Sequence, residues 1–251
     1  MNILAFFAHP DDETILAGGT FILLARLGFN IHYLCATRGE GGEVGEIPMS
    51  SIQMLGKVRE GEMRCAVEVL GGKSVTFLNF IDPSIGPNNE LYAYTDDLEP
   101  LSEIIAAKVI DLDIDAIFTH GVNGEYGHPA HLISHKAAHR ATSLLSDRST
   151  SLYSVSAFFQ NHPKPHIMNV DEPAHIIIDI SSVLEEKTTA ALCHRTQHAL
   201  FVRRSSAEQG RNMTVSEVII SLESLHRVMP EMTDKEEDPI FMQLKPWQFM
   251  L

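Results

Sequence analysis

The chain has 251 residues, of which 44% are hydrophobic, and its mean hydropathy is −0.01, which fits one globular core with a possible C-terminal appendage. A formal net charge of −14 and a pI near 5.3 argue against the basic surface that binds nucleic acid or anionic lipid. No segment approaches the roughly 20 apolar residues of a membrane-spanning helix. We therefore expect neither a nucleic-acid nor a membrane partner.

Apolar runs alternate with amphipathic stretches along the first 200 residues. The apolar runs predict strands at 3–8, 30–37, 74–80, 115–121, 151–159 and 174–180. Helical periodicity predicts helices over 14–27, 51–70, 97–110, 128–145 and about 181–197. This alternation is typical of an α/β fold, in which a three-layer, mostly parallel, Rossmann-like sheet carries helices on both faces.

Two glycines and the last 50 residues stand out from this pattern. Gly18 and Gly19 inside the first predicted helix indicate a close approach of that helix to the sheet. Residues 202–212 resemble a loop, and 214–228 a helix. We expect one domain over residues 1–200, with residues 201–251 as an extension that packs on it or at a subunit interface.

The cysteines and the N-terminus bear on the compartment. Cys35, Cys65 and Cys193 lie far apart and form no CxxC pair, which argues against a disulfide framework or a thiolate metal site. We expect them to be small buried side chains in a reducing compartment. The chain begins MNILAFFAHP, without a basic region and with an apolar run too short for a signal peptide, so we expect a cytoplasmic protein.

Two polar clusters each follow a predicted strand. AHPDDE (8–13) begins at the end of the first strand, and THGVNGEYGHPAH (119–131) at the end of the fourth. Parallel α/β sheets bind ligands beyond the carboxyl ends of their strands. We therefore expect both clusters on the same rim of the sheet.

Three adjacent acids, residues 11–13, favour a bound cation, because a divalent ion lowers the cost of packing carboxylates together. Zinc accepts imidazole and carboxylate ligands, and catalytic zinc sites use three protein ligands plus water. Two histidines and one aspartate from HPDD (9–12) and HPAH (128–131) satisfy that need. His131 and His135 could also chelate a metal at a spacing of four, but the glutamate of an HExxH site is absent. We expect His135 and His139 to be surface or hydrogen-bonded core histidines.

These motifs also resemble those of a known family. AHPDDETILAGG (8–19), ATRGEGG (36–42) and YGHPAH (126–131) are similar to the signatures of the LmbE/PIG-L-like zinc-dependent N-acetylglucosamine deacetylases. The resemblance covers roughly residues 1–200 in the right order. It implies metal ligands at His9, Asp12 and His131, which hold Zn²⁺ or another divalent transition metal, and a general base at Asp11.

The resemblance also implies groups around the metal. His128 would stabilise the charged intermediate as an imidazolium or protonate the leaving amine, and Tyr126 would assist. Arg59 and Asp82 would contact substrate. Arg59 is better explained as a helical ion-pair partner of Glu62 or of another surface acid, and Tyr126 is explained equally well as a loop aromatic. Many family members have aspartate where this chain has Ala130, which bears on the protonation of His128.

The reaction that the resemblance implies is removal of the N-acetyl group from a small molecule, a conjugate or an oligosaccharide, that contains N-acetylglucosamine. Acetate and a free amine would be released. Two alternatives stay open, an amidase of thiol conjugates of the mycothiol type and a non-catalytic metal- or sugar-binding protein. A homo-oligomer is common in the family. Glu13 has no role in this reaction. We expect it either to orient His9 or to interact with the positive end of the following helix.

Overall fold

A seven-stranded sheet forms the centre of the molecule in the computed structural model, which describes residues 1–46, 48–145, 148–233 and 237–250. The strand order is β3-β2-β1-β4-β5-β9-β8. The bounds are β1 (Asn2–Phe7), β2 (Asn30–Cys35), β3 (Ser74–Phe77), β4 (Ala116–Thr119), β5 (Ser151–Val155), β8 (Ile176–Asp179) and β9 (Leu222–Met229). The first five strands pair in parallel, whereas β9 runs antiparallel to both β5 and β8. The expected mostly parallel α/β sheet is confirmed.

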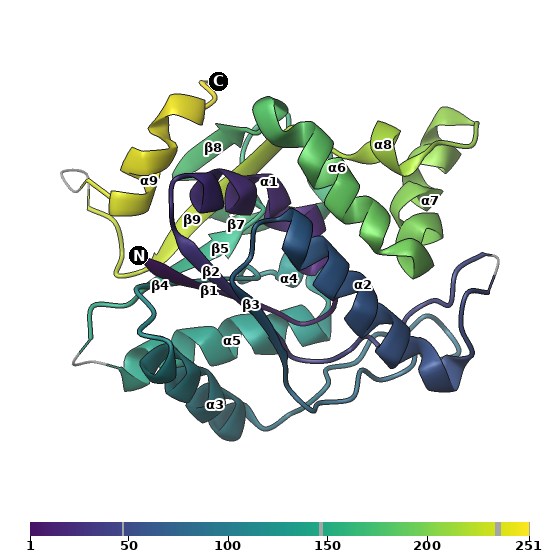
Figure 1. Ribbon diagram of the computed structural model, residues 1–251, viewed down its shortest axis with the longest axis horizontal. Coiled ribbons are helices and arrows are strands. Elements are labelled where there is room, and N and C mark those ends of the chain that lie inside the picture. The colour runs from purple at the N-terminus through teal and green to yellow at the C-terminus, as the bar shows by residue number, and fades with distance from the viewer. Residues whose placement is uncertain (47, 146–147, 234–236, 251) are drawn as a thin grey trace.

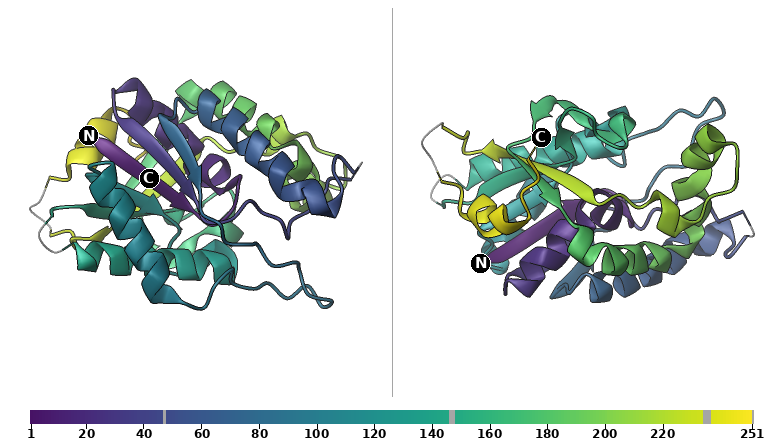
Figure 2. Two further views of the ribbon diagram at one scale, coloured as in Figure 1. Left: turned by 60° about the horizontal axis from the view of Figure 1, so that its bottom comes forward. Right: turned by 90° about the horizontal axis from the view of Figure 1, so that it is seen from above.

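Helices cover both faces of this sheet (Figures 1 and 2). One face carries α1 (Asp12–Arg26), α2 (Leu55–Val69) and α6 (Leu184–Cys193), and the other carries α3 (Leu98–Asp111) and α5 (Pro129–Leu144). Successive residues of β1 belong to opposite cores, Ile3 and Phe7 to the first and Leu4 and Phe6 to the second. A strand buried on both faces has to be apolar throughout, which explains why the N-terminal run is continuous.

Shorter elements connect these layers. The remaining helices are α4 (Gly124–Gly127), α7 (His198–Gln209), α8 (Val215–Val218) and α9 (Pro239–Leu244). A second, two-stranded sheet pairs β6 (Ala157–Phe158) with β7 (Asn169–Pro173). The 3-10 turns are η1 (Ile52–Met54), η2 (Pro165–Ile167), η3 (Ser181–Val183), η4 (Arg195–Gln197) and η5 (Lys245–Trp247). None of the described helices combines the length and the apolar composition that a bilayer span requires.

Helix α1 is interrupted where its glycines lie. Ala17 leaves helical geometry with φ −147° and ψ 18°. A Cβ on Gly19 would lie 2.6 Å from Cβ of Ile180, so the helix approaches the end of β8 more closely than a side chain allows. The Glu223 carboxylate of β9 accepts the N–H groups of Gly19 and Thr20 at 2.8 and 2.7 Å, which satisfies donors at the interruption. The predicted close approach is confirmed.

The C-terminal region differs from the expected loop and helix. Residues 202–212 are mostly helical in α7, and 214–228 contain only the short α8 before the chain becomes β9. The side chains of β9 that face α1 and α9 are Glu223, Leu225 and Arg227. Because two of these three are charged, the sequence of the strand does not alternate between apolar and polar residues. β9 lies inside the sheet, and the N–H of Phe249 donates to O of Ile177 in β8. A subunit contact by residues 201–251 stays a prediction.

A disulfide joins Cys65 of α2 to Cys193 at the end of α6, so the expectation of no disulfide was wrong. The two residues are 128 positions apart, and the packing of α2 along α6 brings their Cα atoms to 5.8 Å. Pairing of this kind depends on which helices are neighbours, and sequence spacing does not show that. Cys35 is free and buried, as expected.

Candidate active site

Both polar clusters lie where β1 and β4 end. β1 and β4 are neighbours in the sheet. The strands that follow β1 in sequence, β2 and β3, are added on one side of this pair, and β5, which follows β4, is added on the other. Where the strand order reverses in this way, a crevice opens at the carboxyl ends of the strands. The N–H of Ala8, after β1, donates to Nε2 of His120, after β4, at 3.1 Å. Thr37 after β2 donates through Oγ1 to O of Ala8 at 2.9 Å. The shared rim predicted from the sequence is confirmed.

The turn after β1 places two neighbouring carboxylates in different directions. Asp11 has φ 108°, a left-handed conformation that costs a non-glycine residue on the order of 1–3 kcal/mol. Asp12 is the first residue of α1, and its Oδ2 accepts the N–H of His9 at 2.9 Å. Oε2 of Glu13 accepts the N–H of Asp11 at 3.0 Å, so Glu13 orients Asp11 rather than His9. The strained turn is therefore held by hydrogen bonds from its own acids.

Arg59 of α2 lies beneath this turn and is 3% exposed. Its guanidinium donates to O of Gly39 at 2.9 Å and to O of Pro10 at 2.6 Å, and Nη2 lies 3.4 Å from Oδ2 of Asp11. Burial raises the pKa of Asp11 to about 7, although the Arg59 charge acts in the opposite direction. The alternative of an ion pair with Glu62 was wrong, because Glu62 binds a different segment of the chain.

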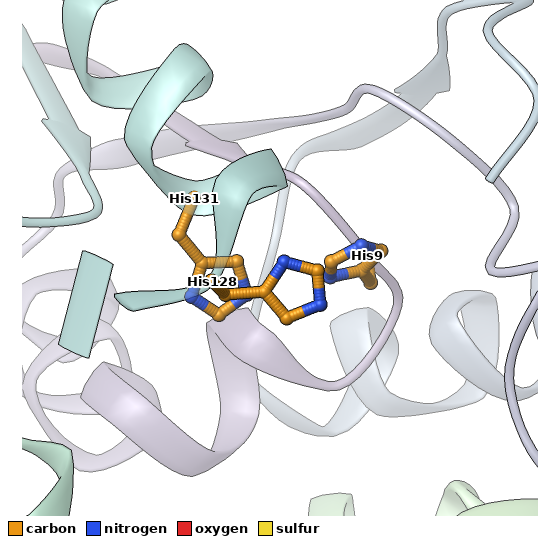
Figure 3. A group of neighbouring side chains, drawn as sticks. All are labelled: His9, His128 and His131. Atoms are coloured by element: carbon orange, nitrogen blue, oxygen red, sulfur yellow. The ribbon is translucent and has the colours of Figure 1, made fainter. Parts of the chain in front are cut away.

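Imidazole rings gather at this rim, and Figure 3 shows those of His9, His128 and His131. Nδ1 of His9 lies 3.2 Å from Oδ2 of Asp12, and Nε2 of His131 lies 3.4 Å from Oδ1. The donor atoms of His9, His128 and His131 lie within 4.8 Å of one another, and so do those of Asp12, His120 and His131. The two groups overlap at His131, and together they form a cluster that could hold a metal ion.

Hydrogen bonds distinguish the members of this cluster. Nε2 of His120 accepts the N–H of Ala8, and Nδ1 of His128 accepts the N–H of Ala130 at 3.1 Å. Nε2 of His9 and Nε2 of His131 are buried and make no hydrogen bond, although Oδ1 of Asp82 lies 3.3 Å from the former. Buried polar nitrogens without a partner are costly, and a bound cation is one way to satisfy them. The donor set therefore fits a metal.

Glu125 fixes the orientation of His131. Its Oε2 lies 2.6 Å from Nδ1 of His131 and 3.0 Å from Nδ1 of His120. Its Oε1 accepts from the side chain of Asn169 at 3.1 Å, and its own backbone has φ 57°. A carboxylate on Nδ1–H leaves Nε2 of His131 as an acceptor, an arrangement common in metal sites.

The sequence reasoning missed Glu125, His120 and Asn169. A signal existed for the first two, because His120 directly follows a strand and Glu125 is the acid between that strand and His128. Asn169 comes from β7, and nothing in the sequence marks it. His135, by contrast, is a buried histidine 2.9 Å from O of His120, and His139 is exposed, as expected.

His128 and Tyr126 lie on the open side of the cluster. The His128 ring stacks on His131 with centroids 4.6 Å apart and lies 4.9 Å from the His9 ring. Partial burial, with His131 and His9 as neighbours, lowers the pKa of His128 to about 3. Since Nδ1 of His128 accepts from Ala130, the neutral ring carries its proton on Nε2, and the expected imidazolium is disfavoured. Tyr126 is 55% exposed, with its ring edge-on to His128.

Comparison with known sequences identifies relatives of this chain. The sequence profile described as PIG-L, GlcNAc-PI de-N-acetylase, matches residues 4–142, more than half of the chain. A probable N-acetyl-alpha-D-glucosaminyl L-malate deacetylase 2 of Bacillus cereus is 28% identical over 201 residues, covering 78% of this chain and 83% of its own. A 1D-myo-inositol 2-acetamido-2-deoxy-alpha-D-glucopyranoside deacetylase of Rhodococcus opacus is 25% identical over 279 residues, covering 94% of both chains.

A solved structure shares the fold at lower identity. The 4-carboxy-2-hydroxymuconate hydratase GalB of Pseudomonas putida superimposes with a TM-score of 0.62 at 20% identity, covering 94% of this chain and 99% of its own. A hydratase on the same fold means that the architecture by itself does not determine the reaction. The chemistry has to be argued from the residues of the rim.

Proposed function

Because the chain belongs to the PIG-L family of GlcNAc-PI de-N-acetylases, we propose that it is a metal-dependent N-deacetylase. It removes the acetyl group from an N-acetylglucosamine-containing small molecule, a conjugate or an oligosaccharide, and releases acetate and a free amine. The names of the Bacillus cereus and Rhodococcus opacus relatives both describe deacetylation of such a molecule. The observation that carries the proposal is that His9 and His131 both lie against the Asp12 carboxylate, and that the Nε2 atom of each ring is buried and makes no hydrogen bond.

We propose His9, Asp12 and His131 as the metal ligands. Zn²⁺ suits two imidazoles and one carboxylate, and another divalent transition metal is the alternative. Such a cation, when bound, polarises the acetamide carbonyl and lowers the pKa of water from about 15.7 toward 7. Glu125 supports the site by holding Nδ1–H of His131, so that Nε2 is available.

Asp11 is the proposed proton carrier. Its buried carboxylate, with a pKa raised to about 7, can accept a proton from the attacking water near neutral pH. The same group can then return the proton to the nitrogen as the amide C–N bond breaks. Arg59 is enclosed by Gly39 and Pro10, so we propose that it positions Asp11 rather than contacting substrate.

The remaining groups act on the substrate. The Nε2–H of neutral His128 is a hydrogen-bond donor for the carbonyl oxygen as negative charge develops there. The hydroxyl of exposed Tyr126 is a second donor on the same side. Asp82, next to His9, is the proposed acceptor for a sugar hydroxyl. Donors held in place before the reaction are worth more than mobile ones, because they need no reorganisation.

Location and assembly are proposals that rest on the sequence. We propose a cytoplasmic location, as expected above, and a homo-oligomer, which is common in the family. The Cys65–Cys193 disulfide weighs against the cytoplasm, since disulfides are rare there. Quenching intact cells with acid and then alkylating the thiols in denaturant, so that buried Cys35 also reacts, distinguishes a reducing from an oxidising location. One modified cysteine per chain indicates an oxidised protein, and three indicate a reduced one.

Acetate release from a panel of substrates tests the function. The panel contains N-acetylglucosaminyl malate, N-acetylglucosaminyl inositol, diacetylchitobiose and a cysteine-conjugate amide, each measured before chelation, after chelation and after return of Zn²⁺. Zinc-restorable acetate release from an acetamido sugar supports the proposal. Turnover of the cysteine conjugate alone indicates a thiol-conjugate amidase. Calorimetric binding without any turnover indicates a binding protein, and either result overturns the deacetylase.

His131→Ala and His139→Ala form a matched pair for this assay. Both histidines lie on α5, but His131 is buried in the metal cluster and His139 is exposed. We expect His131→Ala to lose both the bound metal and acetate release. His139→Ala should keep both.

A further inference from the structure

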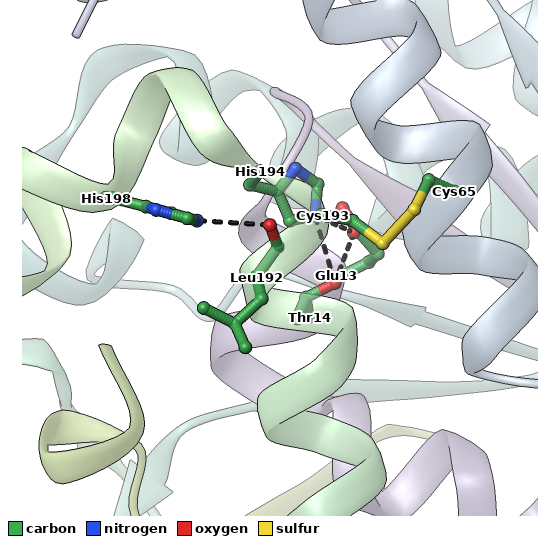
Figure 4. Close-up of a disulfide and its surroundings, with 7 residues drawn as sticks. All are labelled: Glu13, Thr14, Cys65, Leu192, Cys193, His194 and His198. Carbon is green, nitrogen blue, oxygen red and sulfur yellow. Dashed lines mark hydrogen bonds and ion pairs between the residues drawn. A yellow bond between two sulfur atoms is a disulfide. The ribbon is translucent and has the colours of Figure 1, made fainter. Parts of the chain in front are cut away.

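Glu13 and His194 form a buried pair that the proposed reaction does not use. Both side chains are 0% exposed. Nε2 of His194, which follows α6, lies 3.0 Å from Oε1 of Glu13 in α1 (Figure 4). The hydroxyl of Thr14 donates to the same oxygen at 2.6 Å. The hydroxyl oxygen of Thr14 also lies 3.2 Å from Nε2 of His194, and since its own proton goes to Glu13, it can only accept from the ring. Both groups that face Nε2 are therefore acceptors, so His194 carries a proton on Nε2 and donates it to the carboxylate.

The other oxygen of this carboxylate reaches the proposed base. Oε2 of Glu13 accepts the N–H of Asp11, the residue with the left-handed backbone. The backbone angles of a residue restrict the rotamers of its side chain, so this bond limits the directions in which the Asp11 carboxylate can point. His194 in turn fixes Glu13, whose carboxylate could otherwise rotate away. The chain of contacts runs from α6 to the turn after β1.

The segment around His194 is attached to α2 on both sides. Before it, Cys193 is bonded to Cys65. After it, the N–H and hydroxyl of Thr196 donate to the Glu62 carboxylate at 2.8 and 2.7 Å. Glu62 and Cys65 lie about one turn apart on α2 and line the same surface cleft of about 650 Å³. These two attachments determine how far His194 stands from Glu13.

On the basis of the proposed deacetylase, we propose that Glu13 and His194 are positioning residues for Asp11, and that the Cys65–Cys193 disulfide holds this pair in place. Cys65 is exposed and Cys193 half-buried, so a reductant can reach the bond. Reduction breaks the S–S bond and adds two electrons and two protons to give two thiols. With a phosphine, the reductant leaves as its oxide, with the oxygen taken from water. The freed end of α6 then holds His194 less firmly, and kcat falls.

Substitutions at His194 separate positioning from simple support of the fold. His194→Gln keeps an N–H donor near the position of Nε2, whereas His194→Leu removes it. We expect kcat of His194→Leu to fall about 10- to 100-fold with KM and metal content unchanged, since a small misplacement of a reacting group costs rates of that order. His194→Gln should recover most of this loss. His198→Leu is the control, because Nε2 of His198 lies 3.1 Å from O of Leu192, away from Glu13, and His198 stands four residues along the chain (Figure 4).

Hydrogen exchange of the Asp11 amide provides a readout that does not depend on turnover. The amide should be protected in the wild type and in His194→Gln, and exchange at least 10-fold faster in Glu13→Gln and His194→Leu. Equal exchange in all four proteins overturns the positioning role even if no substrate has been found. A wild type without turnover, but with this protection pattern, overturns the deacetylase and leaves the positioning role supported.

Phosphine treatment tests the disulfide. We expect it to lower kcat of the wild type severalfold and to have no effect on Cys65→Ser, which should already show the reduced rate. Metal content is measured in each sample, so that loss of metal is not mistaken for loss of positioning. Wild type with the same kcat and the same Asp11 exchange before and after reduction overturns the role of the disulfide.

Discussion

Asp11 has the environment that a proton carrier needs, because it is buried, held by its backbone and raised in pKa to about 7. Asp11→Asn keeps the shape of the side chain and removes its basicity. We expect kcat to fall about 10²- to 10⁴-fold, the usual contribution of a positioned acid–base group, while metal content is unchanged. Steady-state acetate release and elemental analysis measure the two quantities. Asp113→Asn, at an exposed aspartate, should leave both unchanged, and an active Asp11→Asn would show that the base lies elsewhere.

Glu125 is expected to act on the metal through His131. Glu125→Gln weakens the bond to Nδ1–H of His131, which keeps Nε2 available. We expect metal affinity to fall about 10- to 100-fold, as for other residues that support a ligand. Competition with a coloured chelator measures this change. Glu172→Gln, at a buried glutamate that accepts the N–H of Val122, is the control. An unchanged affinity in Glu125→Gln would mean that His131 does not depend on this carboxylate.

The residues of the proposed metal site differ in how far the sequence could reveal them. The grouping of His9, Asp12 and His131 was predictable, because their motifs follow strands whose carboxyl ends meet at one rim. Their proposed role depends on the family resemblance as well. Asn169 was not predictable, since it reaches Glu125 from β7 only after the chain has folded.

At the scale of elements, the junction of α1, α6 and β9 depends on a buried ion pair. Nζ of Lys187 lies 2.8 Å from Oε1 of Glu223, and that carboxylate also binds the interruption of α1 at Gly19. Lys187→Met leaves a buried carboxylate without its cation, so we expect the free energy of unfolding to fall by about 3–5 kcal/mol. Urea unfolding followed by circular dichroism measures it.

The double variant Lys187→Met/Glu223→Gln provides the control for this pair. It removes both charges, so the loss should be smaller than in Lys187→Met alone. A double variant that is less stable than the single one would show that Glu223 contributes mainly by binding α1 rather than by its charge pair.

The same pair explains why β9 was mistaken for a helix. A strand buried on one face usually shows alternating apolar residues, and β9 has Glu223 and Arg227 on its buried face instead. Each is compensated from a distant element, Glu223 by Lys187 and Arg227 by Asp238. Local sequence carries no sign of either partner. The parallel strands were predictable because their burial is purely apolar.

At the scale of the whole molecule, α2 and α6 join two segments that are far apart in the sequence. Arg59 lies in the first half of α2, next to the turn that carries the proposed base, and Cys65 in the second half forms the disulfide. The layered sheet could be predicted from alternation alone. The link between α2 and α6 could not, because it joins residues 128 positions apart.

The disulfide should therefore stabilise the molecule as a whole. Closing a loop of 128 residues restricts the unfolded chain, and removing such a bond typically costs about 2–4 kcal/mol. We expect Cys65→Ser to unfold at a lower urea concentration than wild type. Phosphine should lower the wild-type midpoint toward that of the variant and leave the midpoint of the variant unchanged. Equal midpoints for untreated wild type, reduced wild type and Cys65→Ser would mean that the bond does not contribute to the stability of the fold.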